Sequence, residues 1–525
     1  MSAPKTTVAL LSCLCLAFAA GHAEAKKKRH HHPHAKSIEL ALKGATSLTG
    51  GVAEISAFDP RTKRLFVVDG SAVLKIVDLS DPSNPTQLPG TLDVAADILA
   101  ETGLAAADAN SIAIKNGLIA VAVAADPVTD AGFVAFYGTN GAYKFSCRAG
   151  ALPDMLTFTP DGRKILVANE GEPDGVDPVG SVSVIDVRKI LRAGDCDASG
   201  AVRTAGFERF DGYEDALRAK GVRLFPGKSV SQDVEPEYIA VSDNSRLAWV
   251  TLQEANAMAL LSVRSARILR ILPLGLKDHS VAGNGLDASD RDGGINIQTW
   301  PVYGMYMPDA IASFRSKGRT YLVTANEGDD RGENERIKDL DLDPSAFPNA
   351  ADLQEDENLG RLAVSSIDGD TDNDGDYDML FAYGARSFTV WDGFGRRVHD
   401  SGDFIGRKTA EAAPALFNAD NGDPGEFDTR SDAKGAEPEG ATTGEAYGRT
   451  YAFIGLERGP GGVMAFDMSK PWSPKFVQYV RRDADVSPEG LLFIDAKDSP
   501  SRKPLLVLSH EVSGTLTVYE IRPKH

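Results

Sequence analysis

The stretch that decides the fold of this chain reads PDMLTF at residues 153–158, PDG at 160–162, KILVAN at 164–169 and SVSVID at 181–186. The longer runs are short and rich in Val, Ile, Leu and Phe, and turn residues separate them, which is the pattern of consecutive β-strands. The unit opens near an acidic residue, Asp154, and its last run ends at Asp186. It therefore predicts a group of short strands joined by turns.

The same pattern recurs seven times along the chain. Its copies begin at Glu54, Asn110, Asp154, Glu237, Asp309, Glu439 and Glu489. Repeats of about 40 to 50 residues that hold several strands are typical of β-propeller blades. Two of the spacings, 44 and 50 residues, fit bare blades, and the longer gaps predict insertions near residues 195–236, 276–306 and 329–438. A short helix is expected at 213–218.

The two ends of the repeat region predict how the ring closes. The last copy supplies only three strands before residue 525. A propeller has to cover its sheet edges, because unpaired edges invite aggregation. We expect the segment from Ile38 to Lys43 to add the missing outer strand of the seventh blade. The sequence thus predicts an all-β fold, a single seven-bladed β-propeller over residues 37–525, closed by an N-terminal strand and carrying inserted loops and short helices.

The N-terminal segment predicts export. A positive start is followed by a 13-residue apolar run (8–20) and by small residues around Ala25, so residues 1–25 are read as a signal peptide. The product is expected in the periplasm or outside the cell. Residues 26–36 are basic and rich in His, which suits either a solvated tail or a site for zinc, copper or nickel.

Two cysteines, Cys147 and Cys196, follow the signal. In an oxidising compartment such a pair can form a disulfide, and two separate thiols are the alternative. No other stretch is apolar over the 18 or so residues that a membrane span needs. We expect a monomer without a transmembrane segment.

The charge of the chain narrows the classes of partner. Its 525 residues include 56 Lys and Arg against 75 Asp and Glu, which gives a formal charge of −19. An acidic chain repels phosphate backbones, so nucleic acid is not an expected partner. The charge is compatible with cations, with basic partners or with solubility alone.

Carboxylates occupy corresponding positions in the repeats. Six of the seven copies begin with one, at Glu54, Asp154, Glu237, Asp309, Glu439 and Glu489. The first strand of each blade lines the central channel of a propeller, so these acids are expected to form a ring. A second set of polar residues lies near the end of the following strand: Asn169, Glu170, Glu254, Asn326, Glu327, Glu457, His510 and Glu511.

Like charges held this close repel one another unless protons or cations share the site. One mouth of the channel is therefore expected to be strongly acidic and to offer oxygen ligands to a hard divalent cation. The alternative is that each acid caps a turn and accepts backbone N–H bonds within its own blade. The sequence leaves both interpretations open.

A nine-residue segment, DTDNDGDYD at 370–378, fits the calcium-loop pattern D-x-D-x-D-G-x-x-D. Its acids are Asp370, Asp372, Asp374, Asp376 and Asp378. The twelfth position is Phe381 rather than Glu and the flanks suggest strands, so the segment resembles calcium loops in β-hairpins of integrin-type blades, not a helical EF-hand. We expect a structural calcium ion that holds a long insertion, with a disordered acidic loop as the alternative.

Longer motifs carry a resemblance to a known family. They are DMLTFTPDG (154–162), ANEGEP (168–173), GLDASDRDG (285–293), MPDAIA (307–312), YGARSF (383–388) and PEG (438–440). Together they resemble the choice-of-anchor I domain proteins, a family related to mesenchyme-specific cell-surface glycoprotein. The resemblance implies an exported propeller. Members carry assorted C-terminal anchors, of which none is expected here, and some relatives bear an alkaline phosphatase label.

Two functions are compatible with these observations. The first is a non-catalytic, calcium-bearing protein that binds a small-molecule or protein ligand at the cell surface or in the periplasm. The second is a metal-dependent phosphatase, in which channel acids hold metal ions that activate water and neutralise a phosphoester. For that activity the further candidates are His279 and His510 as metal ligands, and Arg331, Arg386 and Arg458 as phosphate-holding groups. No P-loop, nucleophile elbow or H-E-x-x-H motif is present, and no catalytic residue is assigned.

Overall fold

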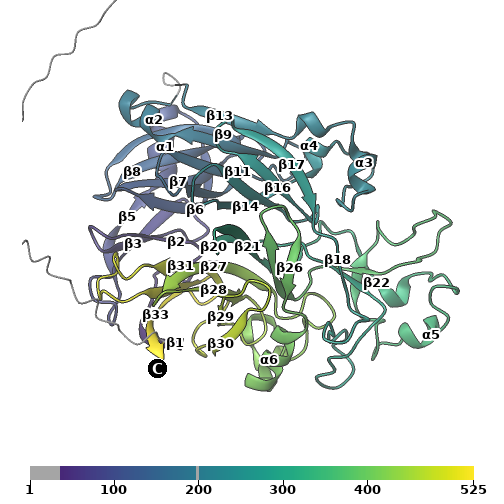
Figure 1. Cartoon of the computed structure of the whole chain (residues 1–525). Coiled ribbons are helices and arrows are strands. Elements are labelled where there is room, and N and C mark those ends of the chain that lie inside the picture. Colours follow the sequence, from purple (N-terminus) through teal and green to yellow (C-terminus); the bar gives the residue numbers. More distant parts are fainter. Residues whose placement is uncertain (1–35, 197–199, 525) are drawn as a thin grey trace, which may run out of the picture. The chain divides into compact units, whose positions relative to one another are not determined.

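The computed structural model describes residues 36–196 and 200–524. The predicted signal peptide and, except for Lys36, the basic tail lie outside these residues. The described residues form seven antiparallel sheets of four strands each. The colours of Figure 1 follow the chain from one sheet to the next. The predicted seven-bladed propeller is confirmed.

The strands of a blade run in chain order from the channel outward, except in the seventh. The blades are β2–β5 (Ser56–Asp59, Arg64–Val67, Val73–Asp78, Thr86–Asp93), β6–β9 (Ala106–Lys115, Leu118–Ala125, Ala131–Gly138, Tyr143–Ala151), β10–β13 (Pro153–Phe158, Lys164–Asn169, Ser181–Asp186, Val202–Gly206), β14–β17 (Pro236–Val241, Leu247–Leu252, Ala257–Ser262, Arg267–Pro273), β20, β21, β25 and β26 (Ile311–Ser316, Arg319–Asn326, Ser387–Asp392, Arg397–Asp400), β27–β30 (Pro438–Ala446, Arg449–Leu456, Val463–Asp467, Lys475–Val480), and β31–β33 (Pro488–Ile494, Leu505–His510, Thr515–Lys524) with β1 (Ser37–Ser47).

The ring closes through the first and last strands of the described chain. The innermost strands contact one another in a closed series, β2, β6, β10, β14, β20, β27 and β31, with β31 returning to β2. Strand β1 pairs antiparallel with β33, so that Ser37 lies opposite Lys524 and Ser47 lies opposite Thr515. The predicted N-terminal closing strand is therefore confirmed.

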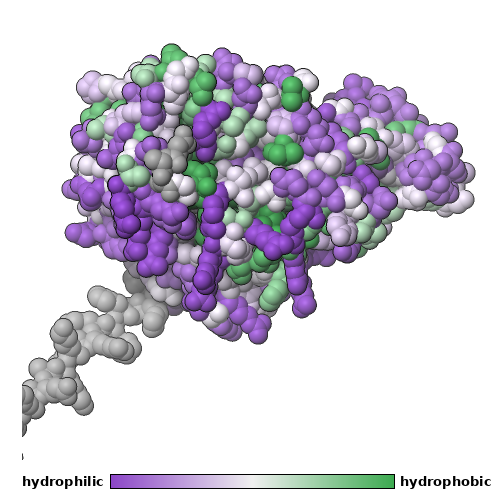
Figure 2. Space-filling view, turned by 90° about the horizontal axis from the view of Figure 1, so that it is seen from above, coloured by the Kyte–Doolittle hydropathy of each residue, from purple (hydrophilic) through white to green (hydrophobic). Residues whose placement is uncertain are grey.

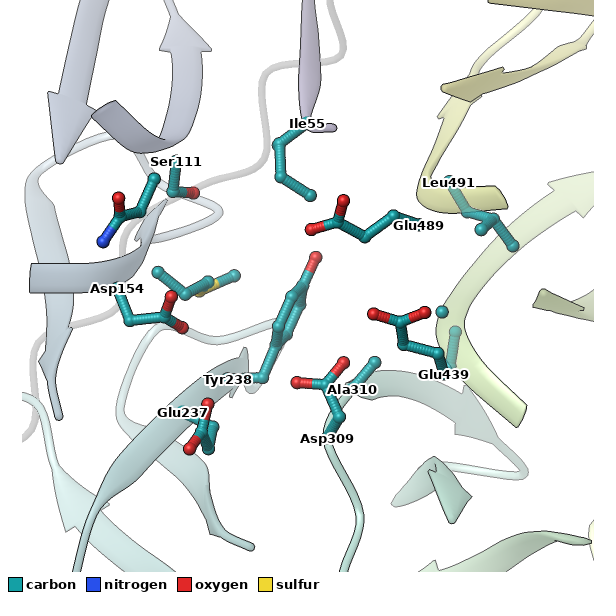
Figure 3. A pocket seen from close by; sticks show the side chains of 14 residues that line it. Ile55, Ser111, Asp154, Glu237, Tyr238, Asp309, Ala310, Glu439, Glu489 and Leu491 are labelled. Carbon is teal, nitrogen blue, oxygen red and sulfur yellow. The ribbon is translucent and has the colours of Figure 1, made fainter. Parts of the chain in front are cut away.

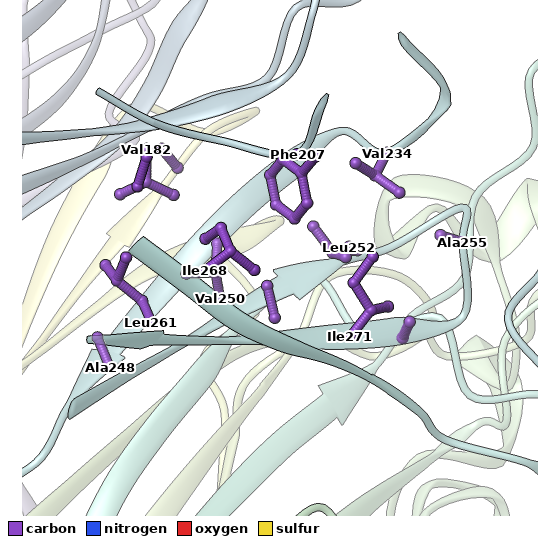
Figure 4. Close-up of a cluster of buried hydrophobic side chains, with 14 of the residues drawn as sticks. Val182, Phe207, Val234, Ala248, Val250, Leu252, Ala255, Leu261, Ile268 and Ile271 are labelled. Atoms are coloured by element: carbon purple, nitrogen blue, oxygen red, sulfur yellow. The ribbon is translucent and has the colours of Figure 1, made fainter. Parts of the chain in front are cut away.

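Apolar side chains fill the interfaces between neighbouring blades. Between the third and fourth blades, Val182 packs in one cluster with Val250, Ile268 and Phe207 (Figure 4). Because a blade is covered on both faces, a middle strand such as β7 is apolar along its whole length, and all eight of its residues are buried. Seen from above, the surface is mostly hydrophilic with scattered hydrophobic residues (Figure 2).

The insertions build a small sheet of their own outside the blades. Its order is β18-β19-β24-β23-β22, with bounds Leu276–Asp278, Tyr303–Met305, Phe381–Ala382, Ala363–Ser365 and Asn334–Arg336. Three of these strands lie between β21 and β25. The stretch 329–438, treated above as an insertion, thus also contains β25 and β26, the outer strands of the fifth blade.

A buried lysine joins this sheet to the fifth blade. Lys277 of β18 is almost fully buried, and its Nζ donates to the carbonyls of Ala385 at 2.7 Å and Gly402 at 2.8 Å. The same atom lies 3.4 Å from Oδ1 of Asp400 in β26. A buried ammonium needs this complete set of partners, so the contact sets the position of the inserted sheet on the blade.

Short helices occupy the connections. They are α1 (Val94–Thr102), α2 (Val187–Ala193), α3 (Glu214–Arg218), α4 (Val230–Asp233), α5 (Ala350–Leu353) and α6 (Phe404–Ala412), with 3₁₀ turns at Glu208–Phe210, Ile337–Asp339, Pro414–Leu416, Asp420–Gly422 and Pro424–Glu426. Helix α3 lies where the sequence predicts one. Among the helices of the described residues, none combines the length and apolarity of a membrane span.

A disulfide links the second blade to the third. It joins Cys147 of β9 to Cys196, which follows α2, with the two Cα atoms 5.3 Å apart. The two cysteines are 49 residues apart in sequence, so the bond restricts a long loop of the unfolded chain.

The closing strand provides a test of the ring. Leu40 and Leu42 both belong to β1, but the first is 3% exposed and the second 52%. Leu40→Ala should lower the free energy of unfolding by about 2–5 kcal/mol, because it leaves a cavity beneath the closing strand. Leu42→Ala is the matched control and should change it by no more than about 0.5 kcal/mol. Urea unfolding followed by circular dichroism measures both, and equal effects would contradict the role of β1.

Candidate functional site

The starts of the inner strands meet around one small cavity. It measures about 100 Å³ and is lined by the carboxylates of Asp154, Glu237, Asp309, Glu439 and Glu489, together with Asn110. The ring of Tyr238 stands among these acids, and its hydroxyl points toward Glu489 (Figure 3). The structure thus brings together five of the six carboxylates that open the repeats. Glu54 immediately precedes Ile55, which lines the cavity.

The same backbone conformation and hydrogen bond recur in four blades beside the acids. In four blades the residue before the inner-strand proline has a positive φ, between 38° and 55°: Leu152, Met307, Glu437 and Ser487. The carbonyl of each accepts an N–H from the end of the second strand, donated by Glu170, Gly328, Glu457 and Glu511 at 2.8–3.0 Å. Non-glycine residues seldom adopt this conformation, and it is commonest where a function needs it. It sets the second row of acids against the first.

No basic side chain lines the cavity to balance the negative charge of its five carboxylates. The fourteen residues that line the cavity include no Lys or Arg. Burial raises the pKa of Asp154 to about 7. Burial first, and the neighbouring carboxylates second, raise the pKa values of the other four well above their usual range. Oε2 of Glu439 is buried without a hydrogen-bond partner. The cavity therefore demands protons or a cation.

The second row of acids is different, because basic side chains reach it. Glu327, Glu437 and Glu457 could offer ligand atoms to one metal ion, since these atoms lie within 4.8 Å of one another. Nζ of Lys434, however, lies 2.6 Å from Glu327 and 3.5 Å from Glu437. Arg458 lies 2.7 Å from Glu457. An ammonium thus already fills the place that a metal would take beside Glu327.

A second basic group pairs with acids of the neighbouring fourth blade. The guanidinium of Arg331 lies 2.9 Å from Asp233, 2.6 Å from Glu235 and 3.7 Å from Glu254. Burial is nevertheless the largest influence on the pKa of Glu254, which rises to about 7. Glu170 is raised well above its usual pKa by burial and by Asp154. The mouth of the channel thus gathers many acids, and Arg331, Lys434 and Arg458 form ion pairs with several of them.

Several of the candidate side chains make bonds within their own blades. Asn169 donates to Ser181 and Ser183 at 3.1 and 3.0 Å. Asn326 donates in the same way to Ser387 and Thr389 at 3.2 and 2.8 Å. These two amides tie the second strand of a blade to the third. For them the local interpretation, in which polar residues hold their own blade together, describes the observed contacts.

The two histidines lie apart from any of the acidic groups that could hold an ion. His279 is buried, its Nδ1 lies 2.6 Å from the carbonyl of Asn284, and burial lowers its pKa to about 3. His510 is buried too, with Nδ1 3.1 Å from the carbonyl of Thr515 and Nε2 3.9 Å from Asp485. Burial lowers its pKa. Neither histidine belongs to the acidic groups whose ligand atoms cluster in the described residues.

The nine-residue acidic loop connects the antiparallel strands β23 and β24 of the inserted sheet. Its five acids form two groups rather than one: Asp370, Asp372 and Asp374 in the first, and Asp376 and Asp378 with Asp343 in the second. Asp343 reaches the loop because Leu342 pairs with Tyr377. Amides of Asn373 and Gly375 donate to Asp370, which folds the loop around the first group.

Some residues of the mouth were not among the sequence candidates: the acids Asp233, Glu235 and Glu437 and the base Lys434. Arg331 and Arg458 were candidates, but as phosphate-holding groups and not as partners of these acids. Glu235 and Glu437 each lie directly before an inner-strand proline, so the tripeptide Glu-Pro-Glu at 235–237 and 437–439 was a usable signal. Lys434 and Asp233 lie in insertions, where no repeat marks their position.

The buried acids imply a dependence of stability on pH. The pKa of Asp154 rises on folding from 3.8 to about 7, so between these values the folded chain keeps a proton that the unfolded chain releases. The free energy of unfolding of the metal-free protein should therefore fall as the pH rises through this window, and Asp154→Asn should flatten the fall. The measurement is the melting temperature in EDTA across this range.

Asp161 supplies the control, because it lies in the turn of the same blade and its pKa is lowered rather than raised. Asp161→Asn should leave the fall in place. Stability that climbed steadily with pH in the wild-type protein would contradict the expectation.

The chain resembles known proteins along most of its length. It is 25% identical over 370 residues to the "Mesenchyme-specific cell surface glycoprotein" of Strongylocentrotus purpuratus, covering 61% of this chain and 46% of that protein. It is 27% identical over 192 residues to "Gigasin-3a" of Magallana gigas, covering 32% of this chain and 67% of that protein. The chain thus spans less than half the length of the first relative.

Among solved structures, the hydrazine synthase of Kuenenia stuttgartiensis superposes with a TM-score of 0.46 at 12% identity, over 90% of this chain and 97% of that one. The decisive match is to a family model. Residues 54–471, from the start of the first blade to beyond β29, match the choice-of-anchor I domain. The protein belongs to the choice-of-anchor I domain family.

Proposed function

We propose that the protein is an exported, calcium-binding propeller of the cell surface or periplasm that acts as a binding module and takes a divalent cation in its central channel. One observation carries the proposal: five partly buried carboxylates line a cavity of about 100 Å³ whose lining includes no basic side chain. A cation would balance the negative charge of these carboxylates, which no basic residue of the cavity lining balances. Such a cavity has room for an ion with several waters.

The chemistry of the cavity favours a hard cation. The polar groups that line it are carboxylates, the amide of Asn110 and the phenol of Tyr238. The lining includes no Cys or His, and its one sulfur is the thioether of Met155. Calcium and similar ions prefer such oxygen sets. The second row at the mouth is a weaker candidate for a metal, because Lys434 already pairs with Glu327 and Glu437 there.

The export and the surface location rest on independent supports. The disulfide between Cys147 and Cys196 suits an oxidising compartment. A curated relative is named as a cell-surface glycoprotein. The N-terminal 25 residues carry the pattern of a signal peptide.

The alternative is a metal-dependent phosphatase, and the contacts of its predicted phosphate-holding residues weigh against it. Arg386 donates to the carbonyls of Asp287, Ser431 and Ala433. Arg331 and Arg458 are engaged by carboxylates. A guanidinium held in this way has few donors left for a phosphate.

The acidic loop should bind calcium in its own right. Asp372→Ala with Asp374→Ala removes two acids of one group, and we expect at least one fewer calcium ion per chain and a smaller calcium-induced rise in melting temperature. Equilibrium dialysis counts the ions at neutral pH. The matched control is Asp352→Ala with Glu357→Ala, two exposed acids of the same insertion. A wild-type protein that binds no more calcium than the loop variant would refute the site.

The channel is tested by a second pair of substitutions. Glu439→Gln with Glu489→Gln should raise the melting temperature in EDTA at about pH 8, because each change removes a carboxyl that the folded chain must either hold as a disfavoured charge or keep protonated. It should also remove one bound divalent ion in dialysis with calcium or manganese. A higher melting temperature with an unchanged ion count would mean that the cavity holds protons only, which overturns the proposal.

Hydrolysis of a chromogenic phosphate ester by the purified chain, with and without calcium, separates the binding module from the phosphatase. The binding module predicts no turnover. Turnover that is lost in Glu170→Gln with Glu327→Gln would instead support the alternative.

A further inference from the structure

Two insertions that are distant in sequence meet at a third acidic group, separate from the channel and from the nine-residue loop. Asp287 and Asp292 lie in the connection between β18 and β19, and Asp428 lies in the connection between β26 and β27. Each offers a ligand atom, and these atoms all lie within 4.8 Å of one another. Neither connection belongs to a blade, so the repeat explains none of the three positions.

One member of the group is buried with an oxygen that has no partner. Asp287 is 1% exposed, and its Oδ1 is fully buried without any hydrogen bond. Its other oxygen, Oδ2, accepts the backbone N–H of Asn296. An unsatisfied oxygen of a buried carboxylate is costly, and in native proteins such an atom commonly contacts an ion or an ordered water.

The second buried member is oriented by its own segment. Asp428 is 3% exposed, and its Oδ1 accepts the hydroxyl of Ser431. That hydroxyl oxygen accepts in turn from Nδ2 of Asn418 at 2.7 Å. Burial raises the pKa of Asp428 to about 8 and that of Asp287 to about 6, and Asp292 adds to both shifts. Hydrogen bonds thus hold these carboxyl groups in place, and their burial and mutual repulsion disfavour the ionised form.

The basic side chains nearby form their ion pairs with neighbouring acids rather than with these three. Arg361 pairs with Asp290 at 2.8 Å and with Asp432 at 2.9 Å. Among the ion pairs of residues 36–196 and 200–524, none within 4.0 Å includes a member of the group. The charge of Arg386 acts against the rise in the pKa of Asp287 that burial causes, but the hydrogen bonds of its guanidinium go to backbone carbonyls, including that of Asp287.

We propose that Asp287, Asp292 and Asp428 bind a divalent cation of the calcium class that joins the two insertions. Three carboxylates supply part of the six to eight oxygen ligands that calcium takes, and backbone carbonyls or waters complete the set. The unpartnered oxygen of Asp287 becomes a ligand, and the two connections are held to one ion. The site is independent of the channel cation, so either can fail without the other.

Amide hydrogen exchange of the full chain, measured with calcium and with EDTA, reports on the two segments that form this site. Calcium should slow amide exchange in both segments, around residues 285–296 and around 417–431. Asp292→Asn and Asp428→Asn should each weaken this effect, with at least about a tenfold loss of calcium affinity in the titration of that protection. Asp292 is only partly buried, so its variant keeps the test valid if Asp428→Asn does not fold.

Two controls separate this site from the others. Glu426→Gln removes an exposed acid of the same connection and should leave the protection unchanged. Asp372→Ala with Asp374→Ala should leave it unchanged as well. The proposal is overturned if calcium protects neither segment or only one of them, or if the protection survives both Asp292→Asn and Asp428→Asn.

Discussion

Repulsion among carboxylates at the centre of the ring is the constraint on which the rest of the structure depends. A propeller superposes its repeats around one axis, so a residue that opens each repeat is multiplied around the channel. Here that residue is an acid in most blades, and five of these acids share a cavity of about 100 Å³. Close burial raises their pKa values, Asp154 to about 7 among them. The fold can carry this charge only with protons or cations.

The negative charge is balanced differently at the mouth of the channel and in the cavity. At the mouth, Arg331 and Lys434 come from connections outside the blades and pair with Glu235 and Glu327. The insertions therefore supply the positive charges that pair with acids at the mouth. In the cavity no such group is present among the lining residues, and the charge is left for a ligand.

Much of the fold and half of the site follow from the repeat, because equal positions in a repeat become equal positions around an axis. The starts at Asp154, Glu237 and Glu439 were predictable for that reason, as was the closing strand. The inserted sheet was not, because strands of two or three residues, such as Phe381–Ala382, leave no periodic signal. Asp343 joins the acidic loop only through the pairing of Leu342 with Tyr377, a tertiary contact that sequence spacing does not reveal.

The pairing of β1 with β33 also determines how the ring responds to mechanical tension. The two ends of the propeller lie side by side, with Ser37 opposite Lys524. A force that pulls these ends apart acts on that outermost pair first and opens the hydrogen bonds of the seam one after another, like a zipper. The bonds never share the load as they would in shear. The seam that completes the seventh blade is thus the place where a stretched molecule begins to open.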